Sequence, residues 1–301
     1  MRRDQTHLRS GYSLVELMVA VAVMAIVTTQ LLSSFSRQHT TAVAQERVIE
    51  LQEEVRIVTD LILSDLRMAG FMVPKFAAVG SIDGGTNGAD VLCMSDPRVI
   101  NDSVLSGASS RFPGAPISSG FSGASSGVSV ASANRDIDSD GDDDFVIGEG
   151  LIIGTGTSSH CGVVTGLSGS TISFTPATAT SFTVTTDDTV VPALVYRVTG
   201  TTLTRNTTVL SNQIEDLQVQ FGVDIDRNGT VEGAEFPIDD LTGEEFELIE
   251  NVRIFVTARD LRASDGFAGQ FPIVANRTTV VAADNFKRRR AIGDTQLRNL
   301  Q

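Results

Sequence analysis

The sequence predicts an α+β fold in which one long N-terminal helix packs on an antiparallel, β-rich globular head. Two observations support this prediction. No Pro or Gly interrupts the chain from Tyr12 to Ala69, and from about residue 72 short apolar segments alternate with turn residues. The composition agrees, because 27 Gly, no Trp and a high Ser and Thr content are typical of a β-rich domain with long polar loops.

The chain begins with a short basic segment followed by an apolar run. Residues 1–11 are polar and basic, and the run from Tyr12 to about Leu32 is apolar except for Glu16 near its start and three polar residues near its end. About 21 helical residues reach roughly 31 Å, which is enough to cross the hydrocarbon core of a bilayer. An acid at that depth costs about 2.5–3.5 kcal/mol, so Glu16 indicates a function.

Three interpretations of this start compete. A secretory signal peptide would be cleaved near Ala42-Val43-Ala44, far beyond the apolar run, and a plain membrane anchor needs only the apolar span. Neither the signal peptide nor the plain anchor requires Glu16. The third interpretation does, because the stretch SGYSLVEL at residues 10–17 resembles the processing site of type IV pilins.

The resemblance to type IV pilins implies specific roles for three residues. A prepilin peptidase is expected to cut between Gly11 and Tyr12, and the new terminal residue, Tyr12, is expected to be N-methylated. Glu16 of one subunit would then pair with the terminal amine of a neighbour inside the apolar filament core. A paired buried charge is tolerated where an isolated one is not.

The second half of the helix carries one apolar stripe. Val48, Leu51, Val55, Val58 and Ile62 recur at spacings of three and four, which predicts one face buried on the head, with a coiled-coil dimer as the alternative. Gly70 is the expected end of the helix.

The end of this helix resembles that of PilW-type minor pilins, on the run ELQEEVRIVTDLILSDLRMAGF. The head resembles the same family at VYRVTGTTLTRN, NQIEDLQVQFGVD, NVRIFVTARDLR and the closing QLRN. Together these likenesses cover roughly residues 9–71, 192–262 and 285–299. They imply a type IV pilin-like layout with a leader at 1–11, a helix at 12–71 whose residues 12–32 lie in membrane or filament core, and a head at 72–301.

Within the head, strands are expected at ADVLCMS, FVIGEGLIIG, STISFTP, ALVYRVTG, EDLQVQFGVD, NVRIFVTARD and FPIVAN. Residues 102–135 are rich in Ser and Gly and are expected to form a long surface loop or partly disordered insertion. The PilW resemblance says nothing about residues 75–190. The basic KRRR at 287–290 is interpreted as a solvated strand or turn, with a contact to a partner pilin or to anionic lipid as the alternative.

Cys93 and Cys161 are expected to form a disulfide, because an exported protein usually oxidises such a pair; two buried thiols are the alternative. They are too few for a structural zinc site, even with His160 beside Cys161. The sequence GASSG at 123–127 matches the G-x-S-x-G pattern of hydrolases, but that motif needs a strand before it and a helix after it, and neither is expected here. We therefore expect no enzymatic activity and no catalytic residues.

The segment DIDRNGTVEGAE at 224–235 fits the twelve-residue calcium loop of EF-hands. Oxygen ligands stand at positions 1, 3 and 5, a glycine at 6 permits the turn, and an acid at 12 can hold the ion with both oxygens. Its flanks look like strand and turn, so we expect an isolated loop. The expected ligands are Asp224, Asp226, Asn228, Thr230, Glu232 and Glu235.

A second segment, DIDSDGDDDFVI at 136–147, shares the early spacing but has Ile147 at position 12. It is more similar to the D-x-D-x-D-G-x-x-D loops of β-rich extracellular proteins, with a solvated acidic turn as the alternative. Ca²⁺ is favoured over Mg²⁺ at both loops, because Mg²⁺ prefers a rigid octahedron with several waters. The expected ligands here are Asp136, Asp138, Asp140, Asp142 and Asp144.

The formal net charge of −14 argues against nucleic-acid binding, which needs basic surface. The resemblance to PilW-type pilins implies a minor pilin of a type IV pilus that takes part in the initiation of assembly or in the tip complex, and the two acidic loops predict a calcium-stabilised head. The implied partners are major and minor pilins, the prepilin peptidase, an inner-membrane assembly platform and a tip adhesin. The subunit would be a single-pass inner-membrane protein with a periplasmic head, and extracellular after assembly.

Two alternatives to this function remain open. A J-type pseudopilin of type II secretion would share the layout and would be told apart by neighbouring genes. A calcium-dependent adhesin on a pilin anchor would use the region 75–190 for attachment.

Overall fold

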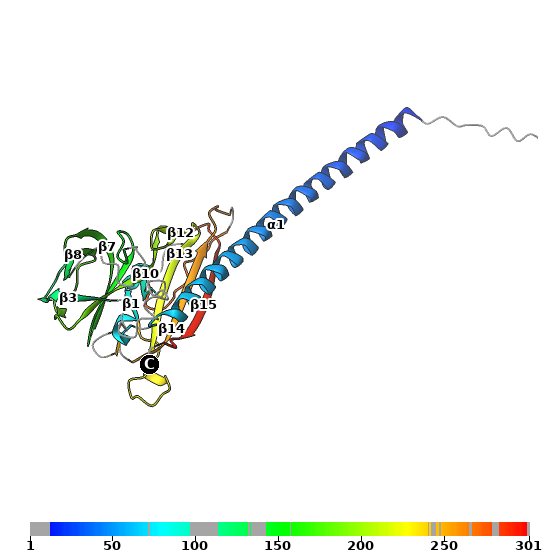
Figure 1. Ribbon diagram of the computed structural model, residues 1–301. Coiled ribbons are helices and arrows are strands. Elements are labelled where there is room, and N and C mark those ends of the chain that lie inside the picture. The colour runs from blue at the N-terminus through cyan, green and yellow to red at the C-terminus, as the bar shows by residue number, and fades with distance from the viewer. Residues whose placement is uncertain are drawn as a thin grey trace, which may run out of the picture. The chain divides into compact units, whose positions relative to one another are not determined.

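The computed structural model describes residues 13–71, 73–96, 114–131, 133, 143–156, 158–239, 241, 245–246, 248–264, 267–278 and 283–299. The chain forms two compact units, Met1–Ile49 and Glu50–Gln301. The predicted α+β class is confirmed, since one long helix precedes a head of antiparallel strands (Figure 1).

Helix α1 spans Leu14–Met68 and has clear signals at both ends. At its start, the backbone N–H of Ser13 donates to the Glu16 carboxylate at 3.2 Å, and the Ser13 hydroxyl accepts the N–H of Val15 at 3.3 Å. This exchange is a capping box. At its end, Gly70 adopts φ 81°, the left-handed conformation that favours glycine after a helix.

In the first unit, the large apolar side chains of α1 from Leu14 to Phe35 are exposed. Leu14, Met24 and Phe35 are 74%, 72% and 70% exposed, respectively. By length and hydropathy this helix is able to cross a membrane. A helix that is apolar on all sides needs lipid or other helices around it.

The second unit contains the strands, three short 3-10 helices and the rest of α1. The 3-10 helices are η1 (Lys75–Ala77), η2 (Gly85–Asn87) and η4 (Gly233–Glu235). The first strands are β1 (Val79–Ile82), β2 (Val91–Ser95), β3 (Ala115–Ser119), β4 (Phe121–Ser122), β5 (Gly127–Val130), β6 (Gly150–Thr155), β7 (Ser158–Ser168) and β8 (Thr171–Thr175). They are followed by β9 (Thr183–Val184), β10 (Thr189–Thr199), β11 (Thr202–Arg205), β12 (Thr208–Ser211), β13 (Ile214–Val223), β14 (Ile249–Arg259) and β15 (Arg288–Gln296).

Six of the described strands close into a ring. The pairing order runs β10-β3-β5-β8-β7-β6, and β6 pairs again with β10, all antiparallel. Apolar side chains from β3, β5, β6, β7, β8 and β10 form one buried cluster together with Phe145 and Phe182. Figure 1 shows β3, β7 and β8 gathered at the side of the head away from β14 and β15. The ring therefore has its own hydrophobic core.

The prediction of a loop at 102–135 was wrong for its described part. Residues 115–119, 121–122 and 127–130 form strands β3, β4 and β5. Alternation explains this, because Ala115, Ile117, Val128 and Val130 all point into the ring and are 3% exposed or less. Ser and Gly occupy the outward positions, where they conceal the strand pattern.

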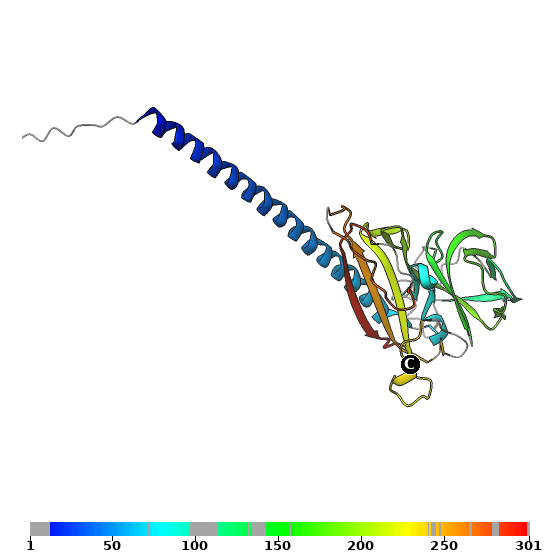
Figure 2. The same cartoon turned by 180° about the vertical axis from the view of Figure 1, so that it is seen from behind.

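The other sheet, β13-β14-β15, packs on the second half of α1 (Figure 2). The predicted helix stripe is buried there, with Leu51, Val55, Val58 and Ile62 each 3% exposed or less, while Val48 is partly exposed. A Cβ atom at Gly293 of β15 would lie only 2.7 Å from Leu63 Cδ1. The missing side chain at Gly293 thus permits close contact between strand and helix.

Two further differences from the predictions concern the C-terminal part. Residues 271–276 form no strand and make a single bridge, Val274 to Arg277. The basic run begins strand β15, and the Arg288 side chain is only 8% exposed, because its guanidinium pairs with Glu215 at 2.7 Å and Asp284 at 2.6 Å. Arg288 is therefore a structural residue rather than a solvated charge.

Buried Asp90 fixes the connection between β1 and β2 onto β13. Its carboxylate accepts the N–H of Gly84 at 2.9 Å and that of Val219 at 2.8 Å, and the residue is 3% exposed. Burial raises the pKa of Asp90 from 3.8 to about 7; the nearby Asp83 and Asp216 add to the effect, and the two N–H donors oppose it.

This pKa predicts a pH dependence of stability. Because the folded state holds the Asp90 proton more tightly than the unfolded state, its contribution is fully present below about pH 4 and is lost as the pH rises towards 7. We expect the melting temperature of the wild type to fall relative to that of Asp90→Asn between pH 4 and 8. The control is Asp187→Asn at an exposed turn. A difference between wild type and Asp90→Asn that is independent of pH would contradict the prediction.

Candidate functional site

Glu16 lies in the first turn of α1 with its side chain exposed. Among the described residues, its carboxylate accepts the capping bond from the Ser13 N–H. The predicted cleavage and methylation residues, Gly11 and Tyr12, lie outside the described residues. The carboxylate is thus held near the start of an uncovered apolar helix, where a partner is able to reach it.

At the other end of α1, the Asp65 carboxylate joins the helix to the β10–β11 hairpin. The Tyr196 hydroxyl donates to Asp65 at 2.6 Å, and the Arg205 guanidinium lies 2.8 Å from the same oxygen. Tyr196 is fully buried, and burial, assisted by Asp65, raises the pKa of its phenol, so the hydroxyl keeps its proton and donates. These residues are far apart in the sequence but all belong to the motifs that resemble PilW-type pilins.

Asn299, from the closing QLRN, caps the C-terminus of the same helix. Its side-chain amide donates to the carbonyl oxygen of Arg67 at 3.1 Å and to that of Ala69 at 3.4 Å. The backbone N–H of Gly70 donates to the Ser95 hydroxyl at 2.8 Å. Backbone groups at the end of the helix that lack a partner within it are thus hydrogen-bonded by Asn299, near the C-terminus, and by Ser95 of β2.

The loop at 224–235 gathers acidic side chains as its sequence predicts. It leaves the end of β13, and carboxylate oxygens of Asp224, Asp226 and Glu235 all lie within 4.8 Å of one another. Asp224 and Glu235 are 7% and 8% exposed. Of the other predicted ligands, Asn228, Thr230 and Glu232 belong to the same loop and are exposed.

Backbone geometry holds these acids in place. Gly229, at position 6, adopts φ 84°, and its N–H donates to Asp224 at 2.8 Å. The N–H of Asn228 donates to Asp224 at 3.0 Å, and that of Asp226 donates to Glu235 at 3.1 Å. In the described residues these carboxylates accept neutral backbone N–H groups and form no ion pair within 4.0 Å. This arrangement of hard oxygen ligands fits Ca²⁺.

The other predicted sites have different outcomes. Asp136, Asp138, Asp140 and Asp142 of the second acidic loop lie outside the described residues. Asp144 is described and is partly buried, next to the buried Phe145. Cys93 on β2 and Cys161 on β7 are joined by a disulfide across a Cα–Cα distance of 5.9 Å, which ties the β1–β2 hairpin to the ring.

Ser125, within the hydrolase-like GASSG, is engaged in a turn. Its hydroxyl donates to the carbonyl oxygen of Gly127 at 2.7 Å, and no described helix follows it. His160 contacts the rings of Phe174 and Phe182, and its Nε2 lies 3.0 Å from the carbonyl oxygen of Pro176. Burial lowers the pKa of this histidine. The two residues make no contact that resembles a nucleophile and its base.

Sequence patterns did not predict the contacts that join the end of α1 to the β10–β11 hairpin and to the C-terminal segment. Asp65, Tyr196 and Asn299 were noted only as parts of a resemblance, and the bond from the Val219 N–H to Asp90 was not expected. A polar residue at an otherwise apolar helix or strand position, such as Asp65 beside the buried Leu66, is the signal that was available.

The Asp65 contacts predict a measurable contribution to stability. Tyr196→Phe keeps the buried ring but removes the hydroxyl, so a bond to a charged group is lost and the free energy of unfolding should fall by about 1.5–3 kcal/mol. Urea unfolding of the full-length chain in detergent measures this change. In an Asp65→Asn background the same substitution should cost less; an equal cost in both backgrounds would contradict the coupling.

Comparison with known proteins gives two matches. Residues 181–299 match the family described as Type IV Pilus-assembly protein W (PilW), and residues 7–29 match the prokaryotic N-terminal methylation motif. No curated protein and no solved structure matches the chain. The PilW match contains Tyr196, Arg205, the acidic loop and Asn299, whereas strands β3 to β8 precede it. The methylation motif at the start of the chain and the PilW segment over its C-terminal part together support a PilW-like type IV minor pilin.

Proposed function

We propose that this subunit is cut after Gly11 by a prepilin peptidase, is methylated on Tyr12, and then enters a pilus through the first half of α1. The match to the methylation motif is the observation that supports this proposal most strongly. In the filament, it contributes to the initiation of assembly or to the tip complex. Before assembly, the helix anchors the chain in the inner membrane with its head in the periplasm.

The exposure of α1 explains why neighbouring pilins are the partners. Each apolar side chain that neighbouring helices cover gains about 1.5–3 kcal/mol, so the uncovered helix favours association. A buried Glu16 without a partner would cost much of this gain. The terminal amine of a neighbour's Tyr12 provides that partner and fixes the axial register. The assembly platform and a tip adhesin are further proposed contacts.

Mass spectrometry of the N-terminal peptide tests the processing step. We expect an N-methylated Tyr12 start in sheared surface filaments, and Glu16→Ala should reduce the amount in filaments at least tenfold while leaving the level in membranes unchanged. Glu46→Ala, an exposed acid further along α1, is the matched control and should assemble normally. A start at Gln45 or an intact Met1 in the filaments would contradict the proposal.

The loop at 224–235 is proposed to bind Ca²⁺ and to stabilise the head outside the cell. Three converging carboxylates repel one another, and a bound cation removes this repulsion while ordering the segment between β13 and β14. Extracellular calcium modules bind with a Kd of about 10⁻⁴–10⁻³ M, which suits external calcium concentrations. The second acidic loop, at 136–147, is proposed as a further site on its sequence alone.

Calcium should therefore raise the melting temperature of the full-length chain. At 100 times the Kd, one site contributes about 2.7 kcal/mol, and chelation with EGTA should reverse the shift. The double variant Asp224→Asn, Glu235→Gln should lose the contribution of the first loop. Asp187→Asn, at an exposed turn outside the loop, is the control and should show the same calcium shift as the wild type. An identical calcium shift in the double variant would show that this loop is not the site.

One observation favours a second candidate function, attachment to a surface. The closed ring lies almost entirely outside the segment that matches the PilW family and has its own core. A ring that folds around its own hydrophobic core tolerates changes of its surface residues. In this case, substitutions of exposed ring residues would abolish attachment while filaments remain.

A further inference from the structure

A cavity of about 460 Å³ lies beside the acidic loop and is not used by the function proposed above. Six residues line it: Lys75, Phe76, Asp224, Arg227, Leu248 and Glu250. They come from η1, from the first positions of the acidic loop, and from the start of β14. Its volume is in the range of cavities that bind small molecules or short peptide segments.

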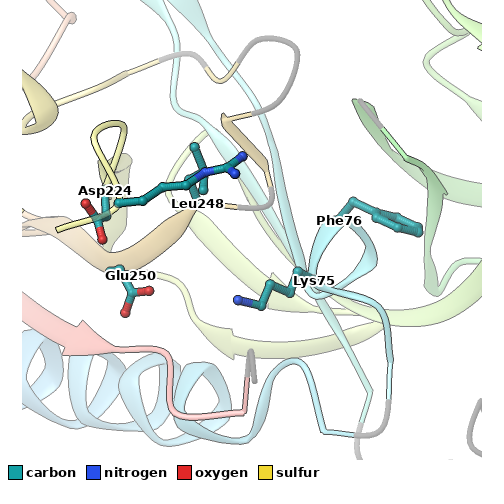
Figure 3. Close-up of a pocket in the computed structure, with 6 residues that line it drawn as sticks. Lys75, Phe76, Asp224, Leu248 and Glu250 are labelled. Atoms are coloured by element: carbon teal, nitrogen blue, oxygen red, sulfur yellow. The ribbon is translucent and has the colours of Figure 1, made fainter. Parts of the chain in front are cut away.

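Two cations of this cavity have no acidic partner. Within the part of the chain that the structure describes, neither Lys75 nor Arg227 has a carboxylate oxygen within 4.0 Å. Figure 3 shows the Lys75 side chain extending towards the side of the cavity where Glu250 and Asp224 lie, while Phe76 points the other way. In a chain of net charge −14, two cations facing one cavity are unusual.

The acidic loop and the cavity share a wall. Asp224 is the first calcium position and also lines the cavity, and Arg227 stands at the fourth position of the loop. Arg227 adopts φ 58°, in the left-handed region that most side chains avoid. The loop conformation that turns Asp224 and Asp226 towards Glu235 thus also places Arg227 at the cavity.

The charge of the cavity depends on whether the loop holds a cation. Without a bound cation, the positive charges of Lys75 and Arg227 are balanced by the negative charges of two other lining residues, Asp224 and Glu250. When Ca²⁺ is coordinated by Asp224, that carboxylate no longer offsets Lys75 and Arg227, and the cavity becomes positive. Glu250, which also lines the cavity, remains able to accept N–H donors and disfavours a single group with two negative charges, such as phosphate.

From this arrangement we infer that the cavity is a calcium-dependent binding site for an acidic peptide segment of a partner protein. A carboxylate of the segment contacts Lys75 and Arg227, and neighbouring backbone N–H groups donate to Glu250. Leu248 and Phe76 provide the apolar part of the wall. The inference rests on the proposed binding of Ca²⁺ to the loop at 224–235.

Fluorescence polarisation of a labelled Gly-Glu-Gly-Glu-Gly peptide with the full-length chain in neutral detergent tests the inference. Binding should require CaCl2 and be lost in EGTA. At constant calcium, Lys75→Gln should weaken binding about tenfold, the loss expected for one charged hydrogen bond. Lys287→Gln removes the chain's other lysine, which lies outside the cavity, and should bind as the wild type does. A Gly-Gln-Gly-Gln-Gly peptide should not bind.

The calcium shift of the melting temperature, measured on the same samples, separates this inference from the proposed function. If calcium raises the melting temperature of both wild type and Lys75→Gln but the wild type binds no peptide, the inference is overturned and the calcium site stands. If calcium has no effect on melting and the peptide binds in EGTA, the calcium dependence is overturned. If an oligomer of galacturonic acid binds through Lys75 and the peptide does not, the assignment to a peptide is wrong.

Discussion

The burial of one face of α1 against the sheet β13-β14-β15 is the constraint on which the rest of the head depends. That face supplies Leu51, Val55, Val58, Ile62 and Leu66 to the largest apolar cluster, together with side chains of β1, β2, β10, β13 and β14. Apolar packing alone tolerates small slips along the helix. The Asp65 carboxylate removes this freedom, because Tyr196 and Arg205 reach it only in one axial position. Asn299 and Ser95 then close the helix end. The end of α1 is thus held on the head by apolar packing and by polar contacts together.

Strand β10 belongs to two structures at once. Along its length it pairs with β3 and β6 of the ring, and also with β2 and β11 beside the helix. The ring buries its own apolar residues, and its six described strands each pair on both sides. The disulfide between Cys93 and Cys161 adds a covalent connection between the two parts. The segment from β1 to β8, which precedes the PilW match, is therefore ordered β-structure in its described part.

The acidic side chains of the head form two groups, one paired with arginines and one in which carboxylates converge on one another. Glu215 and Asp284 are satisfied by Arg288, and Asp216 by Arg277, so these acids join strands and loops. Asp224, Asp226 and Glu235 converge without a basic partner at their centre and accept backbone N–H groups instead. The first group contributes to the fold. The second group stores electrostatic repulsion, which the proposed binding of a divalent cation would relieve.

The sequence by itself determined the features that depend on local spacing. The unbroken run from Tyr12 to Ala69, the position of Glu16, the buried stripe from Leu51 to Ile62 and the twelve-residue acidic loop all follow from residues close together in the chain. Only the tertiary structure decided how distant segments meet: the closure of β6 on β10, the burial of Arg288, the contact of Asp65 with Tyr196 and Arg205, and the shared wall of loop and cavity. Strand pairing and buried ion pairs join residues tens to hundreds of positions apart. Their partners are selected by the packing of the whole core, which local alternation does not specify.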